Sequence, residues 1–468
     1  MLFGCPFSWA KTIFGGCKLG DQRRTRRLVD YAAEQARSAH ATTLAACRGD
    51  AAAAEGAYRL LRNDKVMPDA IAKGGFEAAV ERIGERALLL AVEDTTIISV
   101  PKRLEMELGD TGGVEDSRRQ GMFAHSVLLV DPRCGETLGL IDQSRWVRDW
   151  ATRGKHHARR ERCYEEKESF KWQQASERVS TRLGDKTTRV ISVCDREADV
   201  YEYMLYKQTM KERFVVRMAR DRALAGERRY LSDVVSRLPP LGDVVVEVKQ
   251  RGGPNARVTR TAHLLVRAGS VQLAAPKRMD HKGIPISVQV VEVIEKRPPK
   301  NTAPLHWILF TTEPVTDLAQ AQDILRFYGF RWRVEDFHKA WKTGCGVEDR
   351  RQHAADNFER VIVILAFIAV RILQLRELDA DNPDAPCTTV LTRLEWRCLW
   401  ASTQNAPLPT QPPTAQWAVR TIGKLGGWIQ TRQAPRPGWL NLWRGWDRLE
   451  ERVAAINLAR SVLAEEKM

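Results

Sequence analysis

The stretch YGFRWRVEDFHKAWKTG (328–344) alternates charged and aromatic side chains, and its spacing decides how the rest of the chain is interpreted. At about 100° per residue, a helix through it carries one polar face made of Tyr328, Arg331, Glu335, Lys339 and Lys342. The opposite face is apolar and holds Phe330, Val334, Phe337 and Trp341. Glu335, rather than Asp336, is therefore the acid that we expect among the cations. An amphipathic surface helix with i,i+4 ion pairs would give the same pattern.

Composition narrows the class of protein. The 468 residues are enough for two or three domains, and the net charge of +15 favours a polyanionic partner, nucleic acid first, although a generally basic protein also fits. The nine cysteines form no C-x-x-C pair, which argues against a zinc ribbon and a disulfide scaffold and is typical of a reducing cytoplasm. We expect no signal segment, because residues 1–16 lack the charged-then-apolar order of one. We expect no membrane partner, because the longest apolar run, 361–370, is too short to span a bilayer and suits a buried helix.

The order of patterns along the chain predicts an α/β fold. Apolar runs that indicate buried strands occur at 87–100, 125–130, 137–146, 189–195 and 213–218. Alternating residues predict a β-rich insertion at about 236–312. The expected layout is a basic helical N-terminal segment (1–70), which suits a DNA-binding module or a solvated helical face, an α/β domain (71–375) and a helical C-terminal domain (376–468).

Two acids fall within or at the end of these apolar strands, Asp94 and Asp195. A buried carboxylate is costly unless it is paired or bound to a metal, and one alone is more often a structural hydrogen-bond acceptor. Two of them, together with Glu335 on a cation-rich helix, indicate a magnesium site, because Mg²⁺ prefers hard oxygen ligands. Two metals held by three carboxylates can activate water and stabilise the leaving oxygen of a phosphodiester.

Four motifs carry a resemblance to a known family. They are EDTT (93–96), CDREAD (194–199), ERFVVR (212–217) and the Y-x2-R-x3-E-x6-K spacing of 328–342. Together they resemble the DDE transposases of bacterial insertion sequences, within the IS-four family and of the transposon-five type. LGDQRRTRRLV (19–29) and WAVRTIGKLGGW (417–428) are also similar to that family, so the resemblance spans nearly the whole chain.

The resemblance implies a ribonuclease-H-like catalytic core and cut-and-paste DNA transposition. It implies that Asp94, Asp195 and Glu335 hold two Mg²⁺ ions, with Mn²⁺ as a substitute. Hydrolysis at the transposon end, hairpin formation and opening, and strand transfer to target DNA would use the same three carboxylates.

The resemblance also implies DNA-binding positions. Trp307 falls where the family stacks a flipped base, although a strand tryptophan in the core would look the same. Phosphate contacts of the transposon end are implied for Arg217, Tyr328, Arg331, Lys339 and Lys342. The basic N-terminal positions expected to bind the end sequence are Arg27, Arg37 and Arg59.

A tryptophan stripe near the C-terminus bears on assembly. Trp443, Trp446, Leu449, Val453 and Ile456 follow helical spacing, which fits either an internal core or a symmetric helix pair. The expected partners are the double-stranded transposon ends, the target DNA and a second copy of the chain in a paired-end complex. The expected place is the bacterial cytoplasm, at the nucleoid. A structure-selective nuclease and a catalytically silent end-binding regulator are the alternatives.

Overall fold

The computed structural model divides into two units of packed residues, and strand β1 (Leu89–Pro101) runs from one into the other. We call Met1–Glu85, Thr95–Gly154 and Arg333–Met468 the helical unit, and Arg86–Asp94 with Lys155–Trp332 the sheet unit. The described residues are 5–101, 108–109, 111, 119–148, 162–226, 229–248, 259–276, 283–300, 302–431 and 434–465. The predicted three-part layout with boundaries near 70 and 375 stays a prediction.

The sheet unit confirms the predicted α/β class. Its strands lie in the order β1-β4-β5-β9-β8-β7-β6. The first three are parallel, and the rest are antiparallel. Their bounds are β4 (Val190–Cys194), β5 (Arg213–Arg217), β6 (Pro240–Val248), β7 (Arg260–Leu273), β8 (Ile286–Glu295) and β9 (His306–Thr311). The parallel strands are the continuous apolar runs and the antiparallel ones are the alternating stretches, as each kind of sheet requires.

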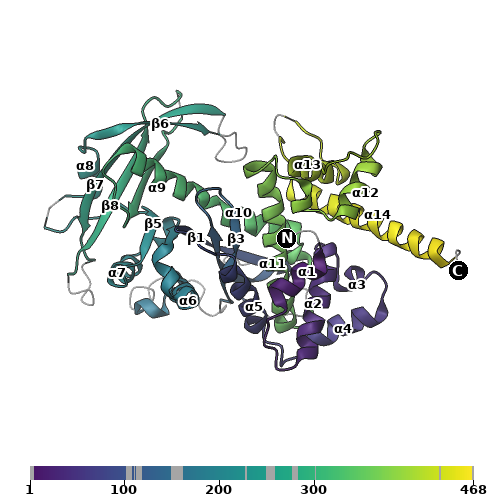
Figure 1. Cartoon of the computed structure of the whole chain (residues 1–468). Helices are drawn as coiled ribbons and strands as arrows, with labels where there is room; N and C mark the ends of the chain where they lie inside the picture. The colour runs from purple at the N-terminus through teal and green to yellow at the C-terminus, as the bar shows by residue number, and fades with distance from the viewer. Residues whose placement is uncertain are drawn as a thin grey trace. The chain divides into compact units, whose positions relative to one another are not determined.

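Helices cover the sheet of this unit on both faces (Figure 1). On one face α6 (Lys171–Leu183), α7 (Tyr201–Thr209) and α8 (Leu231–Val235) share a core with Cys194 and Phe310. Helix α9 (Leu318–Phe330) packs against β4 and β5. Because neighbouring residues of a strand point to opposite faces, Asp195 and Leu309 point away from that core.

The N-terminal part of the helical unit is all-helical, as predicted. It contains α1 (Pro6–Phe14), α2 (Gln22–Arg37), α3 (Thr43–Ala46), α4 (Ala51–Leu61) and α5 (Pro68–Glu81). Asp21 accepts a hydrogen bond from the Arg23 amide and caps α2. Strands β2 (Arg119–Val130) and β3 (Thr137–Trp146) form an antiparallel pair, with β2 next to β1.

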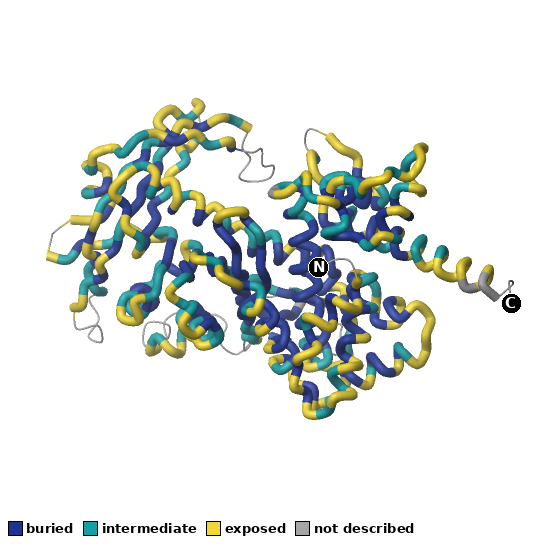
Figure 2. Tube along the Cα trace, in the orientation of Figure 1, coloured by how far each residue is buried: buried dark blue, intermediate teal, exposed yellow. Residues whose placement is uncertain are grey.

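The remaining helices of this unit surround one apolar helix. They are α10 (Trp332–Lys339), α11 (Ala355–Asp381), α12 (Arg393–Thr403), α13 (Ala415–Leu425) and α14 (Trp439–Glu465). Helix α11 is buried along 360–375, so the run at 361–370 is the predicted buried helix (Figure 2). Short 3₁₀ turns lie at Tyr164–Glu166, Glu168–Phe170, Gly184–Arg189, Arg196–Ala198, Val347–Asp349 and Cys387–Thr389.

The stretch 328–344 is not one continuous helix, which corrects the geometry expected from its sequence. Helix α9 ends at Phe330, α10 begins at Trp332, and a π-helical turn (Ala340–Gly344) follows α10. The apolar face is nonetheless buried at Val334, Phe337 and Trp341. The wider π turn changes the angle per residue, so the direction of Lys342 cannot be derived from the spacing of a regular helix.

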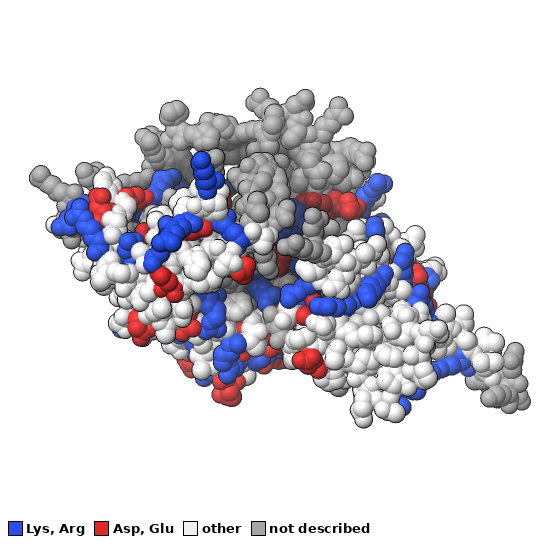
Figure 3. Space-filling view, turned by 90° about the horizontal axis from the view of Figure 1, so that it is seen from above, with Lys and Arg blue, Asp and Glu red and all other residues white. Residues whose placement is uncertain are grey.

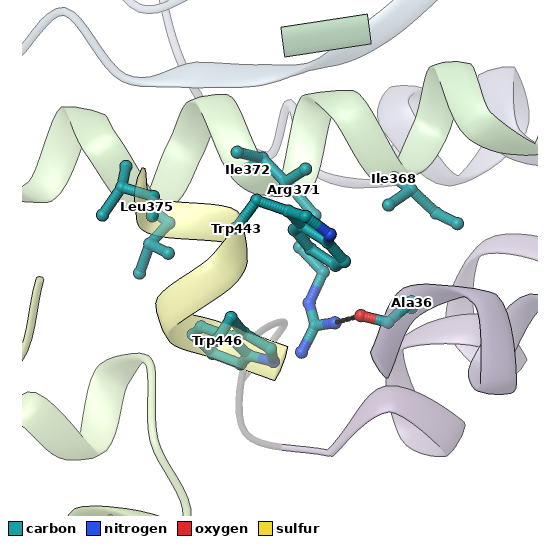
Figure 4. Close-up of a pocket in the computed structure, with 8 residues that line it drawn as sticks. Ala36, Ile368, Arg371, Ile372, Leu375, Trp443 and Trp446 are labelled. Atoms are coloured by element: carbon teal, nitrogen blue, oxygen red, sulfur yellow. Dashed lines mark hydrogen bonds between the residues drawn. The ribbon is translucent and has the colours of Figure 1, made fainter. Parts of the chain in front are cut away.

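The tryptophan stripe is mostly core, which corrects the expectation of an exposed dimer face. Trp443, Trp446 and Leu449 are each less than 5% exposed. In Figure 4 the two tryptophans of α14 lie beside Arg371 of α11, whose guanidinium donates to the Ala36 carbonyl. Val453 and Ile456 are partly buried against the same core. This part of the stripe is therefore already used within the helical unit.

Candidate active site

The two strand aspartates lie next to each other on neighbouring strands. Strands β1 and β4 pair in parallel with Val92 opposite Val193. Asp94 and Asp195 each follow two residues later, so the same register places them opposite each other and on one face. Adjacent strands are about 4.8 Å apart, which brings both carboxylates within reach of one ligand.

Strand β5 adds a cation to this row. Cys194 pairs with Val216, so Arg217 follows in register with Asp195. Arg217 also lies opposite Leu309 of β9, two residues from Trp307 on the same face. The Arg217 guanidinium carbon is 6.0 Å from the Trp307 ring centroid. The row thus contains two acids, one guanidinium and one half-buried indole.

Arg331 pairs directly with the first aspartate. Its Nη1 lies 3.1 Å from Asp94 Oδ2, and the two side chains are 8% and 17% exposed. The guanidinium carbon also lies 5.9 Å from the Tyr328 ring centroid and 5.0 Å from that of Trp332. Charge pairing and aromatic contact together hold Arg331 at the edge where Asp94 lies.

Asp195 is in a different electrostatic setting. It accepts a 2.7 Å hydrogen bond from the Glu197 amide. Burial raises the pKa of its carboxyl above the ordinary value; that amide and the charges of Arg331 and Lys171 oppose the rise, while Glu197 adds to it. Removal from water thus disfavours the anion on balance, and a bound cation would stabilise it.

The opposite face of the same strands holds polar residues that the sequence analysis did not identify. The Cys194 thiol donates to Glu93 Oε1 at 3.1 Å, and the Tyr203 hydroxyl donates to the same oxygen at 3.4 Å. Lys207 Nζ lies 2.7 Å from Glu212 Oε2 and 3.0 Å from Ser192 Oγ. This network ties β1, β4 and α7 together behind the aspartates. The available signal was that both Asp94 and Asp195 follow a polar or thiol residue within an apolar strand.

Three predicted residues lie in the helical unit, on α10 and the π turn after it. Glu335 is half-buried and four residues after Arg331 in the chain. Lys339 lies 3.7 Å from Asp336, the acid expected to point elsewhere. Lys342 donates to the Ile97 carbonyl at 2.8 Å and lies 3.0 Å from Glu348. Lys339 is thus exposed for a ligand, whereas Lys342 already has two protein partners.

The N-terminal candidates lie on α2 and α4 of the helical unit. Arg27 and Arg37 line one groove. Arg27 crosses Gly56 so closely that a Cβ there would fall 1.5 Å from Nη1, which explains the glycine at this helix contact. Arg37 pairs with Glu34, and Arg59 lies 2.8 Å from Glu55 and is exposed.

The donor set fits a hard divalent cation in its chemistry. Asp94 and Asp195 supply carboxylate oxygens from adjacent strands, which is what Mg²⁺ or Mn²⁺ binds. Among the residues that the structure describes, no cluster of three or more His, Cys, Asp or Glu side chains is arranged to hold a metal. The histidines at 156 and 157, a weaker metal candidate, lie outside the described residues.

Two family models match this chain, and the matched segments include most of the residues described above. A family model described as "Transposase DNA-binding" matches residues 6–66, which include Arg27, Arg37 and Arg59. A second, described as "Transposase DDE domain", matches residues 145–371. That match spans Asp195 and Glu335, whereas Asp94 precedes it.

The class of protein follows from these matches and the fold. Together they support a DNA transposase with a DNA-binding domain and a DDE domain, a DNA-cleaving enzyme whose class uses divalent metal ions. The mixed sheet with its many helices is consistent with that class. Within the described part of the chain, no helix has both the length and the apolar character needed to span a bilayer.

Proposed function

We propose that the chain is a cut-and-paste transposase of a bacterial insertion sequence, of the transposon-five type, with a ribonuclease-H-like core. The observation that carries this proposal is the register of Asp94, Asp195 and Arg217 on three parallel strands. Two adjacent carboxylates beside a guanidinium suit a scissile phosphodiester, because they can hold cations while the guanidinium binds a phosphate oxygen.

In this proposal Asp94, Asp195 and Glu335 hold two Mg²⁺ ions, for which Mn²⁺ can substitute. The ions, when bound, would activate the attacking oxygen and neutralise charge on the leaving oxygen. The Arg331–Asp94 pair keeps a guanidinium at the edge of the strands. Arg331 can orient the Asp94 carboxylate or turn to a phosphate, with Arg217 as a second phosphate ligand.

The proposed reaction takes place in four displacements at phosphorus. Water attacks at the transposon end and releases the transposon's 3′-hydroxyl, leaving a 5′-phosphate on the flanking DNA. This hydroxyl attacks the phosphodiester of the opposite strand, which forms a hairpin and expels the 3′-hydroxyl of the flanking strand. A second water opens the hairpin, and the 3′-hydroxyl then attacks a phosphodiester of target DNA and expels a target 3′-hydroxyl. Trp307, half-buried and beside Arg217, would stack a base flipped from the hairpin. Tyr328, Lys339 and Lys342 would contact end phosphates.

End recognition is proposed for the N-terminal module. Arg27, Arg37 and Arg59 lie on α2 and α4 within the matched DNA-binding segment. Their cations would bind phosphates of the inverted repeat. Such an enzyme would act in the bacterial cytoplasm, on DNA of the nucleoid.

We also propose that two copies join two ends before cleavage. The tryptophan stripe is largely core, so we assign the interface to the exposed apolar residues near the end of α14 instead. Leu458, Val462 and Leu463 are 67%, 47% and 56% exposed near the end of that helix. Replacing Leu458 and Val462 with glutamate should preserve single-end binding and abolish the mixed-length band that two labelled ends of different length give on a native gel. Retention of that band would move the interface elsewhere.

A strand-transfer assay with the element's own ends tests the function. A transposase joins the end to target DNA in the presence of Mg²⁺ or Mn²⁺. A structure-selective nuclease on the same fold would cut without joining, and a silent regulator would bind the ends without cutting. Joined product with both ends would exclude the nuclease and the regulator. Cutting without joining, or binding without cutting, would exclude the transposase.

A further inference from the structure

A group of cations, of which only Lys339 is among the residues proposed above to contact DNA, lies around two carboxylates of the helical unit. It is formed by α10, α11, α13 and the segment just before α14. We call it the C-terminal basic cluster; its members are Asp336, Lys339, Arg376, Asp379, Arg420 and Arg436. Asp336 directly follows Glu335 in the chain.

Each carboxylate of the cluster is shared by two cations. Asp336 Oδ1 lies 3.7 Å from Lys339 Nζ and 3.7 Å from Arg376 Nη1. Asp379 is buried and lies 2.8 Å from Arg420 Nε and 3.3 Å from Arg436 Nε. Four positive charges therefore face two negative ones, so the cluster has surplus positive charge.

The cations are accessible and held in place. The side chains of Lys339 and Arg436 are 57% and 46% exposed, and that of Arg420 is 31% exposed. Arg376 lies over the Trp439 ring, with 4.3 Å between the guanidinium carbon and the ring centroid. Lys and Arg side chains are exposed on the described part of the face in Figure 3, including the side of the C-terminal helices.

The positive charges of the cluster also repel one another. Burial lowers the pKa of Arg376, Asp336 opposes the change, and the charges of Arg436 and Arg333 lower it further. Like charges at this range repel. An anion placed among them would relieve the repulsion without displacing the two carboxylates.

We propose that the C-terminal basic cluster binds the phosphate backbone of a DNA duplex, without reading its bases. Arg420 and Arg436 contact the shared carboxylate of Asp379 through Nε, which leaves their other N–H groups to donate to phosphate oxygens. Four cations from three helices and a loop form a surface rather than a pocket, which suits a repeating polyanion. The proposal rests on the proposed function only in that DNA is the partner, and it extends DNA contact to Arg376, Arg420 and Arg436, which have no role in that function.

The test is the salt dependence of binding to a duplex of unrelated sequence, measured by fluorescence anisotropy between about 50 and 200 mM salt. The full-length double variant Arg420→Gln/Arg436→Gln should lower the slope of log affinity against log salt by about 0.9 for each lost phosphate contact. Affinity at the low-salt end should fall on the order of tenfold. Arg436→Lys keeps the charge, so it should keep most of the slope.

Arg397→Gln is the matched control. Arg397 is exposed on α12 and lies outside the cluster, so its loss removes the same kind of charge from the same part of the chain. An unchanged slope for a double variant that melts like the parent would overturn the proposal. So would an equal loss in the Arg397 control, which would indicate general charge.

A third outcome separates another partner from DNA. If the double variant keeps its slope but changes its sedimentation, the cluster binds an acidic segment of a second copy and the DNA proposal fails. A parent protein that lacks joining activity but shows the expected slope difference from its variant would overturn the proposed transposition and leave this surface standing. The two proposals are therefore judged by separate measurements.

Discussion

Arginines serve two different roles in the two units, and their partners reveal which. At the edge of the sheet unit, Arg331 faces the carboxylate of Asp94 and two aromatic rings. In the helical unit, Arg360 donates to the carbonyls of Leu61 and Val66 at 3.0 and 2.7 Å, and the carboxylate of the exposed Asp64 lies farther away, at 3.6 Å. Both guanidiniums are buried, so burial does not separate them. A carboxylate partner leaves room for exchange with a phosphate or a cation, whereas backbone carbonyls make the arginine part of the framework.

The framework role recurs along one segment. Arg350 donates to the carbonyls of Ala39 and Ala41, and Arg371 donates to that of Ala36. Ala36 and Leu61 lie at the C-terminal ends of α2 and α4, where carbonyls lack helical partners and cations are favourable. Buried arginines thus anchor the N-terminal helices to α11 and the loop before it.

The largest expected effect is at the carboxylates. Asp94→Asn, Asp195→Asn and Glu335→Gln should each reduce end cleavage by about 10³-fold or more, because neutral amides bind hard cations poorly. Binding to the end and the melting temperature should change little, which gel shift and thermal melting would measure. Glu197→Gln, an exposed acid beside Asp195, is the control and should cleave normally. Cleavage near the parent rate by any of the three would remove that residue from the site.

The second prediction concerns a framework arginine, where we expect stability to fall and cleavage to be kept. Arg360→Met should destabilise the helical unit by about 2–4 kcal/mol, because the carbonyls of Leu61 and Val66 lose a buried charged donor. Cleavage per folded molecule should stay within a few-fold of the parent. Denaturant unfolding would measure the loss, with Arg351→Met, exposed and nearby, as the control. If Arg360→Met melted like the parent but failed to cleave, the division between framework and site arginines would be wrong.

The sequence predicted the strand that carries Asp94 and the strand that ends just before Asp195, whereas the role of these acids in a site stays a prediction. Asp94 and Asp195 could be found because an acid is conspicuous within an apolar strand, and period two fixes which face it shares. Their register could not be found, since it depends on pairing between residues about 100 positions apart. The break at Arg331 was not predicted either, although Gly329 lies two residues before it, because the helical spacing of charged and apolar residues continues through this point and Arg331 keeps right-handed helical backbone angles.

For the tryptophan stripe near the C-terminus, the sequence predicted which residues share a face but not what that face contacts. Helical spacing identified Trp443, Trp446 and Leu449 as one face, which the structure confirms. Spacing does not say whether such a face meets its own chain or another, because both contacts bury the same apolar surface. The partners of the framework arginines could not be predicted from the sequence either. Arg350, Arg360 and Arg371 donate to carbonyls of residues that lie about 300 positions earlier in the chain, at 36, 39, 41, 61 and 66.

The third prediction concerns a buried acid of the helical unit. Burial, with the nearby Glu450, raises the pKa of Glu395 to about 8, against which Arg371 acts. A raised pKa means that the folded state holds the proton more tightly, so stability is complete below about pH 4.5 and falls as pH rises through about 8. Glu395→Gln should flatten this fall, by about 1–3 kcal/mol between roughly pH 6.5 and 8.5.

Urea unfolding at several pH values would measure that slope. The Glu395→Gln variant would keep a side-chain oxygen for the Thr392 amide, which now donates a 2.6 Å hydrogen bond to Glu395. Burial also raises the pKa of Asp447, to about 6, so its contribution ends below this window. An equal slope in parent and variant would show that Glu395 stays ionised in the folded chain.

The smallest expected effect is at the exposed N-terminal arginines. It tests whether an arginine paired with a carboxylate can be lost without a loss of stability. Arg59 is exposed and paired with Glu55 one turn earlier, so Arg59→Ala should leave stability within about 0.5 kcal/mol. End binding should weaken a few-fold, and the salt slope should fall by about 0.9, the value of one phosphate contact. Arg27→Ala should do the same, although its contact with Gly56 adds a small packing loss. Arg23→Ala is the control, because Arg23 pairs with Asp21 at the start of α2 and is 92% exposed. Anisotropy with the end duplex and with an unrelated duplex would separate sequence-specific from general binding. If Arg59 and Arg23 gave the same slope change, Arg59 would contribute only general charge, and end recognition would have to come from other residues.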